Sequence, residues 1–339
     1  MVDLLPTAEQ REIVDSLSRY LDEVHPVGRL VKHDQDPLAA TDGWAELTGQ
    51  GWLAIGLPEE NGGAGLATVE EALAVRLFGR VLASPLVLGT LLGARLALRA
   101  GNEALAARIA GGHEQVALAV PVGPLDLRED TVVGDIFLLD AANVTLVAGI
   151  GEQGAALVER SALGDVAEVA GMDDHIGLGH VTTGSFPVLH RLEGPELWHQ
   201  ALVLGAAYLA GICDSVCEMA ASYARMRQQF GQPIGAFQAV KHRCADMAIG
   251  VEAVGSQLAV AALAVTEQRA DAGFQALSAK IVAGNCAIVS AEENIQVHGA
   301  IGTTADLSAH LFLKRAHVMD MLFGSSRFLK SRLIVEPFP

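Results

Sequence analysis

The residues best suited to chemistry lie in the stretch 225–234, which reads Arg-Met-Arg-Gln-Gln-Phe-Gly-Gln-Pro-Ile. A long helical pattern ends there in basic residues and a Phe-Gly turn, and a new helical pattern starts near Phe237 with Gln238 in its first turn. An arginine at such a corner can hold a pyrophosphate through paired hydrogen bonds, and a nearby helix N-terminus favours the same anion. Arginines also collect at helix C-termini because they suit the macrodipole, so this stretch alone leaves both interpretations open.

A second run, Gly149-Ile150-Gly151-Glu152-Gln153-Gly154, fits the GxGxxG fingerprint of dinucleotide-binding folds, and Glu168 follows at about the expected distance. That fingerprint requires a helix directly after the glycines, inside a βαβ unit. Residues 155–160 instead look like a strand, and no alternation of strands and helices surrounds them. We therefore favour a glycine-rich hairpin over a nicotinamide-dinucleotide site.

The chain contains four cysteines, Cys213, Cys217, Cys244 and Cys286. They form neither a CxxC pair nor the Cys/His spacing of a metal site. We interpret them as small core hydrophobes and expect no metal ion. A chain with this cysteine usage suits a reducing compartment such as the cytoplasm.

The bulk composition excludes several classes of protein. The chain has 339 residues, of which 51% are hydrophobic and 19% charged, so we expect a folded core rather than disorder. Its net charge of −17, with only 23 Lys and Arg, argues against binding to nucleic acid or to an anionic membrane. Residues 1–11 lack the apolar run of a signal peptide, and no stretch reaches about 18 uninterrupted apolar residues, so we predict no membrane-spanning helix.

Periodicity predicts three structural regions. Apolar residues at helical spacing predict helices over residues 9–24, 44–51, 68–80 and 86–99, with a turn-rich stretch at 57–65. Between residues 116 and 192 the helical period disappears, and β-rich runs at 116–120, 131–139, 144–147, 155–158 and 181–188 predict strands. Long helices are predicted again over 196–228, 237–267, 272–296 and 308–323. The fold class is therefore mainly α with a small β unit, ending in a helical bundle.

Three blocks of the chain resemble the acyl-CoA dehydrogenase family. The stretch 225–234 with Phe237 and Gln238 is similar to the family's R-x-x-F-G turn and the F-Q helix that follows it. Gln296-Val297-His298-Gly299-Ala300-Ile301-Gly302 is similar to the Q-x-x-G-G-x-G turn between its last long helices. The N-terminal block comprises Trp44, Gly51-Trp52-Leu53, the stretch 57–65 and the helix end Phe78-Gly79-Arg80.

The resemblance implies an N-terminal helical domain at 1–115, a shortened middle β-domain at 116–192 and a C-terminal four-helix bundle domain at 193–339. It also implies FAD as the cofactor and the α,β-desaturation of an acyl-CoA thioester. In that reaction a carboxylate takes the α-proton and the β-hydride passes to the flavin. In the family one FAD spans two subunits, with its ring in the β-domain of one and its ADP half held by the C-terminal domain of the other.

The resemblance assigns the grip on the ADP half to six residues, here called the clamp: Arg227, Phe230, Gln238, Gln296, Gly299 and Ala300. Arg227 would bind the pyrophosphate, with Phe230 packed at the turn and Gln238 hydrogen-bonding nearby. The other three would line the adenine end, where Ala300 replaces the usual second glycine.

Two other parts of the family's pattern are missing. The β-domain segments T-E-P-x-x-G-S-D and K-x-x-I-T/S-N, which hold the flavin ring and the thioester, are absent, and residues 121–127 read Pro-Val-Gly-Pro-Leu-Asp-Leu. The glutamate that serves as base is replaced by Phe323, and its alternative position, on the first long C-terminal helix, falls at or near Ala201. We call Phe323 and Ala201 the base positions, and neither can accept a proton.

These observations predict a subunit of an FAD-dependent acyl-CoA dehydrogenase that completes a homologous catalytic partner's FAD site, in an α2β2 assembly resembling actinobacterial steroid-CoA dehydrogenases. We expect a steroid side-chain CoA thioester as the substrate and electron-transfer flavoprotein as a candidate acceptor. One alternative is a self-sufficient homo-oligomer that uses a displaced base such as Asp320. Another is a non-enzymatic scaffold with the same fold.

Overall fold

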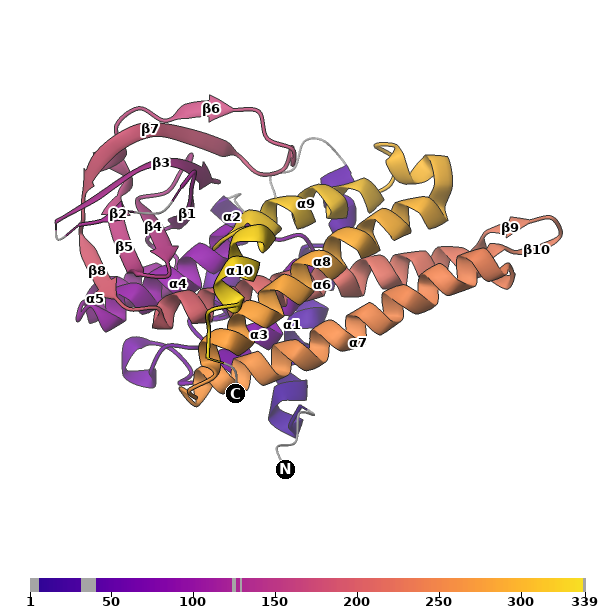
Figure 1. Ribbon diagram of the computed structural model, residues 1–339, viewed down its shortest axis with the longest axis horizontal. Helices are drawn as coiled ribbons and strands as arrows, with labels where there is room; N and C mark the ends of the chain where they lie inside the picture. The colour runs from indigo at the N-terminus through magenta and orange to yellow at the C-terminus, as the bar shows by residue number, and fades with distance from the viewer. Residues whose placement is uncertain (1–5, 32–40, 124–125, 129, 338–339) are drawn as a thin grey trace.

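The sequence regions fold into three units that follow one another along the chain (Figure 1). The computed structural model describes residues 6–31, 41–123, 126–128 and 130–337. A group of helices comes first, a single curved β-sheet follows, and long helices complete the chain. This arrangement confirms the predicted fold class. Pro124 and Leu125, in the stretch that replaces a flavin-binding segment, lie outside the described residues.

The first helix shows how local sequence sets an element's start. The Thr7 hydroxyl accepts a hydrogen bond from the Gln10 backbone, and the Gln10 side chain accepts one from the Thr7 backbone, which is a capping box. Both α3 and α4 have the predicted bounds, whereas α5 was not predicted. The N-terminal helices are α1 (Ala8–Val24), α2 (Thr41–Gly49), α3 (Thr68–Arg80), α4 (Leu86–Arg99) and α5 (Glu103–Ala110), with 3-10 turns η1 (Val27–Val31) and η2 (Glu59–Asn61).

The β unit is one eight-stranded sheet in the order β6-β7-β3-β1-β4-β5-β8, with β2 beside β3. All neighbours pair antiparallel except β1 and β4. The prediction missed the short strands β2, β6 and β8. The strands are β1 (Val116–Pro121), β2 (Asp126–Leu127), β3 (Thr131–Leu139), β4 (Leu146–Gly151), β5 (Gly154–Glu159), β6 (Ala167–Val169), β7 (Leu178–Pro187) and β8 (His190–Glu193), with η3 (Arg160–Leu163) after β5.

The C-terminal unit is built on three long helices. The four predicted helices are present, and a fifth short helix, α10, was missed. The elements are α6 (Glu196–Met226), β9 (Gln228–Gln229), β10 (Gln232–Pro233), η4 (Ile234–Ala236), α7 (Gln238–Thr266), α8 (Ala272–His298), η5 (Gly299–Thr303), α9 (Ala309–Met321) and α10 (Ser326–Leu333).

Helix α6 packs closely against its neighbouring helices, because small residues on its surface let them approach. A Cβ on Gly211 would lie 1.9 Å from the backbone oxygen of Arg76 in α3, so only glycine fits there. The Arg76 guanidinium then forms a two-bond ion pair with Asp214 on the next turn of α6, at 2.7 Å for each bond. Through these contacts the N-terminal helices and the bundle share one core.

Three helices are, by length and composition, apolar enough to cross a membrane, although the search for uninterrupted apolar runs predicted none. Single polar positions interrupt each of them, which is why that search missed them. In the structure, 72% of the apolar window of α6 and 56% of that of α8 is buried inside the protein. The corresponding share for α7 is only 28%, so this helix presents most of its apolar surface outward.

Candidate functional site

The first half of the clamp is a short hairpin at the end of α6. The Arg227 backbone N–H donates to the Tyr223 carbonyl at 2.8 Å, and its own carbonyl accepts from Ile234 at 2.8 Å. Between these bonds β9 and β10 pair around Phe230 and Gly231, whose φ angles are +53° and +81°. Two left-handed residues in a two-residue loop match the twist of a hairpin, and Gly231 supplies one of them without strain.

The second half of the clamp is the end of α8. Gly299 caps this helix with φ of +67°, a left-handed conformation that favours glycine. Gln296 and Ala300 lie on either side of the cap and are exposed, whereas His298 is buried. The glycine of the Q-x-x-G motif therefore has a backbone reason to be where it is.

The two halves meet at one end of the bundle because α6 and α8 run in the same direction. At their starts His199 of α6 lies beside Gly273 of α8, and at their ends Tyr223 stacks on His298. Gln238 begins α7 at that same end, where an ion pair between Arg243 and Glu293 joins α7 to α8. The structure thus places the Arg227 turn, the start of α7 and the end of α8 at the same end of the bundle, which also carries the projecting β9–β10 hairpin (Figure 1).

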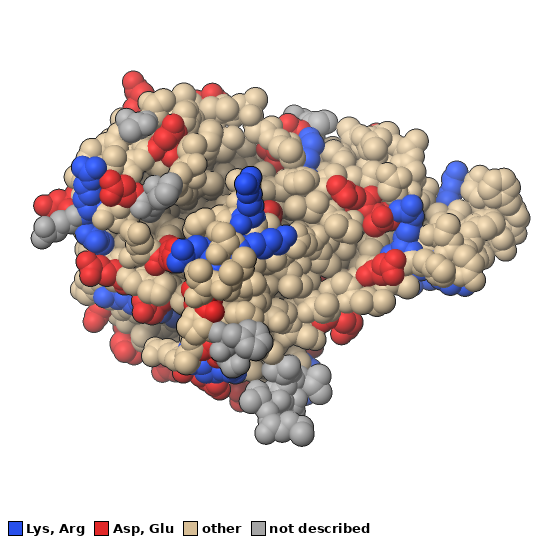
Figure 2. Space-filling view, in the orientation of Figure 1, with Lys and Arg blue, Asp and Glu red and all other residues tan. Residues whose placement is uncertain are grey.

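The clamp end is basic although the chain as a whole is acidic. Arg225, Arg227 and Lys241 are all exposed there, and Figure 2 shows Lys and Arg atoms around the base of the projecting hairpin. The Arg227 guanidinium makes no hydrogen bond or ion pair with any residue that the structure describes. The N-terminus of α7 has no side-chain cap, so its first backbone N–H groups are also available. The Arg227 guanidinium and these backbone N–H groups together fit the pyrophosphate of FAD, whereas Arg225 donates to Ser222 on its own helix.

The two base positions also meet, farther back along α6. The Phe323 ring lies 3.3 Å from where a Cβ on Gly205 would be, one turn after Ala201. Ala201 is fully buried and Phe323 is 8% exposed. The Phe323 carbonyl accepts a hydrogen bond from the indole of Trp198 at 2.8 Å. An apolar contact therefore occupies the place where the family's two base positions converge.

Asp320, the candidate for a displaced base, is held by the bundle itself. Its carboxylate accepts a hydrogen bond from Ser326 at 2.9 Å and packs against Gly284 of α8. Its carbonyl accepts one from the fully buried Lys280 at 3.0 Å. Burial lowers the pKa of Lys280 to about 8, against the opposing effect of the Asp320 charge. Asp320 is thus a structural carboxylate in the last turn of α9, hydrogen-bonded to the start of α10.

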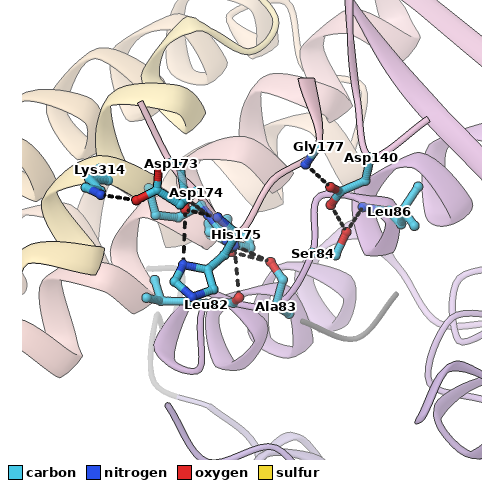
Figure 3. A network of polar contacts seen from close by, with 12 residues as sticks. Leu82, Ala83, Ser84, Leu86, Asp140, Asp173, Asp174, His175, Gly177 and Lys314 are labelled. Carbon is cyan, nitrogen blue, oxygen red and sulfur yellow. Dashed lines mark hydrogen bonds and ion pairs between the residues drawn. The ribbon is translucent and has the colours of Figure 1, made fainter. Parts of the chain in front are cut away.

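A buried arginine that the sequence analysis did not single out joins the β unit to the helices through Asp173, which Figure 3 labels. Arg315 of α9 pairs with Asp173 of the β6–β7 loop at 2.5 Å, and the two side chains are 1% and 2% exposed. Arg315 also donates to the Tyr208 hydroxyl at 2.8 Å and to the carbonyls of Leu82 and Ala83. Burial alone would raise the pKa of Asp173, but the Arg315 charge and the hydrogen bonds from Arg315 and His175 together outweigh it and hold that pKa below its usual range.

A second set of contacts closes the same junction. The Asp140 carboxylate, at the end of β3, accepts hydrogen bonds from Ser84 and from the Gly177 backbone (Figure 3). Asp140 and Leu82 both have left-handed backbones, with φ of +52° and +53°. Non-glycine residues hold this conformation only where their surroundings enforce it. The junction between the sheet and the helices is therefore fixed by internal contacts.

The described part of the sheet encloses a small apolar cavity. The cavity inside it, lined by residues that include Val132, Ile136 and Phe186, has a volume of about 20 Å³. That is room for about one water molecule. The run Gly149–Gly154 is a tight hairpin in which Gly151 pairs with Gly154 across β4 and β5. The favoured hairpin interpretation is confirmed.

The four cysteines gather between α6, α7 and α8, which their sequence positions do not reveal. The Cys286 thiol lies 3.6 Å from the Ser290 hydroxyl, and its hydrogen bond with Cys213 lowers the pKa of Cys286 to about 7. Among the described residues, no group of three or more His, Cys, Asp or Glu is placed to hold a metal ion.

Comparison with known proteins agrees with this geometry. Residues 7–112 match the family described as acyl-CoA dehydrogenase, N-terminal domain, and residues 199–334 match acyl-CoA dehydrogenase, C-terminal domain. Acyl-CoA dehydrogenase IpdE2 of Mycobacterium tuberculosis is 33% identical over 86% of this chain and 86% of its own length.

Two solved structures share the fold. A chain of the ChsE4-ChsE5 complex from Mycobacterium tuberculosis superposes with a TM-score of 0.86 at 22% identity, covering 99% of this chain and 100% of that one. A chain of the Tcur3481-Tcur3483 steroid ACAD G363A variant does so with a TM-score of 0.83 at 24% identity, covering 96% of each chain.

Proposed function

Because this chain belongs to the acyl-CoA dehydrogenase family, whose cofactor is FAD, we propose that it is the non-catalytic subunit of a hetero-oligomeric acyl-CoA dehydrogenase. In this proposal its clamp holds the ADP half of an FAD whose ring lies in a homologous catalytic partner. The partner supplies the carboxylate that removes the α-proton. The bound flavin accepts the hydride.

The observation that carries this proposal is the separation of the clamp from the base positions. Helices rise about 1.5 Å per residue, so Arg227 lies roughly 39 Å along α6 from Ala201. That is longer than an extended FAD molecule. In this proposal an FAD held at Arg227 places its ring in a neighbouring subunit rather than beside this chain's own base positions.

The chemistry of the base positions supports the same division of labour. General-base catalysis needs a carboxylate or a similar group within reach of the substrate proton. Phe323 and Ala201 offer none, and the carboxylate of Asp320 faces α8 and α10 rather than the contact between them. This chain therefore contributes binding and positioning, and the partner contributes proton transfer.

The exposed apolar surface supports a partner of the same fold. Phe230 is 91% exposed and Met226 72%, on the arm that carries the clamp. On α7, Ile249 is 67% exposed, and this helix borders a groove of about 360 Å³ that it shares with α1 and α3. Large exposed apolar side chains close to a binding site are typical of a protein interface.

The decisive test replaces Arg227 with alanine in the complex co-expressed with its catalytic subunit. We expect FAD binding to weaken by roughly tenfold or more, because a charge-assisted hydrogen bond contributes about 1.5–3 kcal/mol. Arg225→Ala is the matched control, since Arg225 is also exposed but donates to Ser222 on its own helix. An Arg227→Ala complex with unchanged flavin content and turnover would mean that the clamp is unused and that the chain is a scaffold.

A second experiment addresses self-sufficiency. The chain purified alone is expected to be unable to reduce FAD with an acyl-CoA, because it has no base at either base position. The complex is expected to hold one FAD for each pair of subunits. A single-chain preparation that is yellow and turns over an acyl-CoA would overturn the proposal in favour of the homo-oligomer.

For the substrate we propose a steroid side-chain CoA thioester, with electron-transfer flavoprotein as the acceptor and the cytoplasm as the location. The support is the likeness to a protein described as a steroid ACAD. Competition between a steroid side-chain CoA and butyryl-CoA on the complex tests it. A higher kcat/KM for butyryl-CoA would remove the steroid assignment and leave the subunit role intact.

A further inference from the structure

The two halves of the clamp are joined by one aromatic pair that has no assigned role. Tyr223 of α6 and His298 of α8 stack with their ring centroids 4.3 Å apart and their planes 29° from parallel. His298 is only 7% exposed. Tyr223 precedes Arg227 by one helical turn, and His298 lies between Gln296 and Gly299 in the chain. The stack therefore sits directly behind the residues that face the cofactor.

Each residue of the pair also bonds within the helix that carries its half of the clamp, Tyr223 through its backbone and His298 through its ring. The Tyr223 carbonyl accepts the Arg227 backbone N–H at 2.8 Å, which sets where α6 stops and the hairpin starts. The ring nitrogen Nδ1 of His298 is 2.8 Å from the Asn294 carbonyl. A carbonyl only accepts, so Nδ1 carries the proton, and the imidazole plane is fixed on α8.

Small buried side chains surround the pair on α6 and α8. The buried residues of α6 and α8 around the pair include Ala220, Ala224 and Ala291, which are at most 4% exposed. Alanine contacts allow close packing but define the relative position of two helices poorly. Asn294 is fully buried, and neither polar atom of its side chain has a partner among the described residues. The stacked rings, in contrast, make a contact whose geometry defines the position of α6 relative to α8.

We propose that Tyr223 and His298 are positioning residues of the clamp, because their stack fixes the spacing between the Arg227 hairpin and the Gln296–Ala300 turn so that both meet one FAD. This inference rests on the proposed function. The pair touches neither phosphate nor adenine. It acts by holding two binding elements, which lie about 70 residues apart in the chain, at one fixed distance.

The experiment measures the FAD dissociation constant of the complex by flavin fluorescence, together with its melting temperature. His298→Ala removes the stack and is expected to weaken FAD binding by about fivefold to tenfold, which corresponds to about 1–1.4 kcal/mol and lies within the range for an aromatic pair. His298→Phe keeps a ring and is expected to restore binding to within about twofold. Tyr223→Leu, which keeps apolar volume without a ring, is expected to match His298→Ala and serves if that variant fails to assemble.

A matched control exists in the β unit, where Phe137 and His180 stack at 4.7 Å and 26°. His180→Ala is expected to leave FAD binding unchanged. In the double variant Arg227→Ala/His298→Ala, the loss is expected to be smaller than the product of the two single losses, because the stack acts through the clamp.

The inference is overturned if His298→Ala binds FAD like the wild type, if His298→Phe is as weak as His298→Ala, or if the double variant shows the full product. Weaker FAD binding in Arg227→Ala but not in His298→Ala would overturn this inference and leave the proposed function intact. Unchanged binding in Arg227→Ala would sink the proposed function first.

Discussion

Phe230 and Phe323 share a backbone conformation that few residues adopt, yet their surroundings differ completely. Their φ angles are +53° and +65°, and such strain costs about 1–3 kcal/mol per residue. Phe323 is buried and its carbonyl is hydrogen-bonded to Trp198, so contacts within the chain offset its strain. Phe230 is 91% exposed on a projecting hairpin, where its contact with another ring is an edge with Phe237 at 6.0 Å.

The difference extends to the regions around them. Near Phe323 the buried polar groups are satisfied internally, as the contacts of Lys280, Asp320 and Arg315 show. Near Phe230 the side chains of Arg227, Gln238 and Gln296 make no hydrogen bond to any residue that the structure describes. One end of α6 is satisfied within the single chain, whereas the other leaves these three side chains without a hydrogen-bond partner among the described residues. This contrast is what favours a half-site over a self-contained enzyme.

The largest effect should come from disrupting the buried ion pair that joins the β-sheet to the helices. Asp173→Asn removes the charge paired with buried Arg315, and we expect a loss of about 3–5 kcal/mol in the free energy of unfolding. Urea unfolding of the chain measures it. The control is Asp174→Asn, whose pair with Lys314 is more exposed and should change stability by at most about 1 kcal/mol. Equal effects of the two substitutions would show that the Asp173–Arg315 pair contributes no more than an exposed ion pair.

The same pair predicts a pH dependence. The pKa of Asp173 lies below its usual range in the folded chain, so the folded form binds fewer protons than the unfolded form in that window. The stability that the pair contributes is present above the ordinary carboxyl pKa of 3.8 and is lost as the pH falls below it. In Asp173→Asn this part of the acid transition should disappear.

A stabilising substitution is expected at Lys280. Its pKa of about 8 against 10.5 for the free side chain means that the folded state disfavours the charged form by about 3 kcal/mol at pH 7. Lys280→Met should therefore raise stability by up to that amount. Between pH 8 and 10.5 the unfolded chain binds more protons than the folded one, so the wild type should gain stability as the pH rises. The stability difference between Lys280→Met and the wild type should therefore shrink over this range. A gap that does not change with pH would show that Lys280 is charged and solvated.

At the clamp end, Phe230→Ala should change the stability of the isolated chain by no more than about 0.5 kcal/mol, because the side chain is exposed. It should weaken association with the catalytic subunit by about 2 kcal/mol, the range of a central aromatic contact in an interface. Analytical ultracentrifugation of the complex measures this. Val122→Ala removes another exposed apolar side chain, from the β unit. It should change neither the stability of the chain nor its association with the catalytic subunit.

The smallest effect is expected at Asp320. Asp320→Asn should lower stability by about 1 kcal/mol by weakening its hydrogen bond with Ser326. It should leave turnover of the complex within about twofold. A loss of turnover by several orders of magnitude would identify Asp320 as the base and restore the self-sufficient alternative.

Sequence patterns predicted the elements whose signals are local. The bounds of α3 and α4 follow from apolar periodicity, and the hairpin at Gly149–Gly154 follows from the absence of a helix after the glycines. Helices α5 and α10 were missed because eight residues carry too few turns for a clear period. Strands β2, β6 and β8 were missed for the same reason, since two to four residues show no alternation.

The candidate site divides in the same way. The Arg227 turn and the Gln296–Ala300 turn are each contained in a few residues, so a motif could locate them. Lys280 and Arg315 look like ordinary solvent-facing positions in a helical pattern, and only the packing of α8 and α9 shows that they are buried. No sequence signal predicted that Tyr223 would stack on His298.

The amino-acid sequence by itself determined which residues could grip a phosphate and that no carboxylate stands at the base positions, because residue identity and short spacing decide both. Only the tertiary structure decided that the Gln296–Ala300 turn comes to the end of α6 beside the Arg227 turn, and that Phe323 packs on α6 near Ala201. Distances between segments depend on how helices pack, and packing is set by contacts between residues that are remote in the chain.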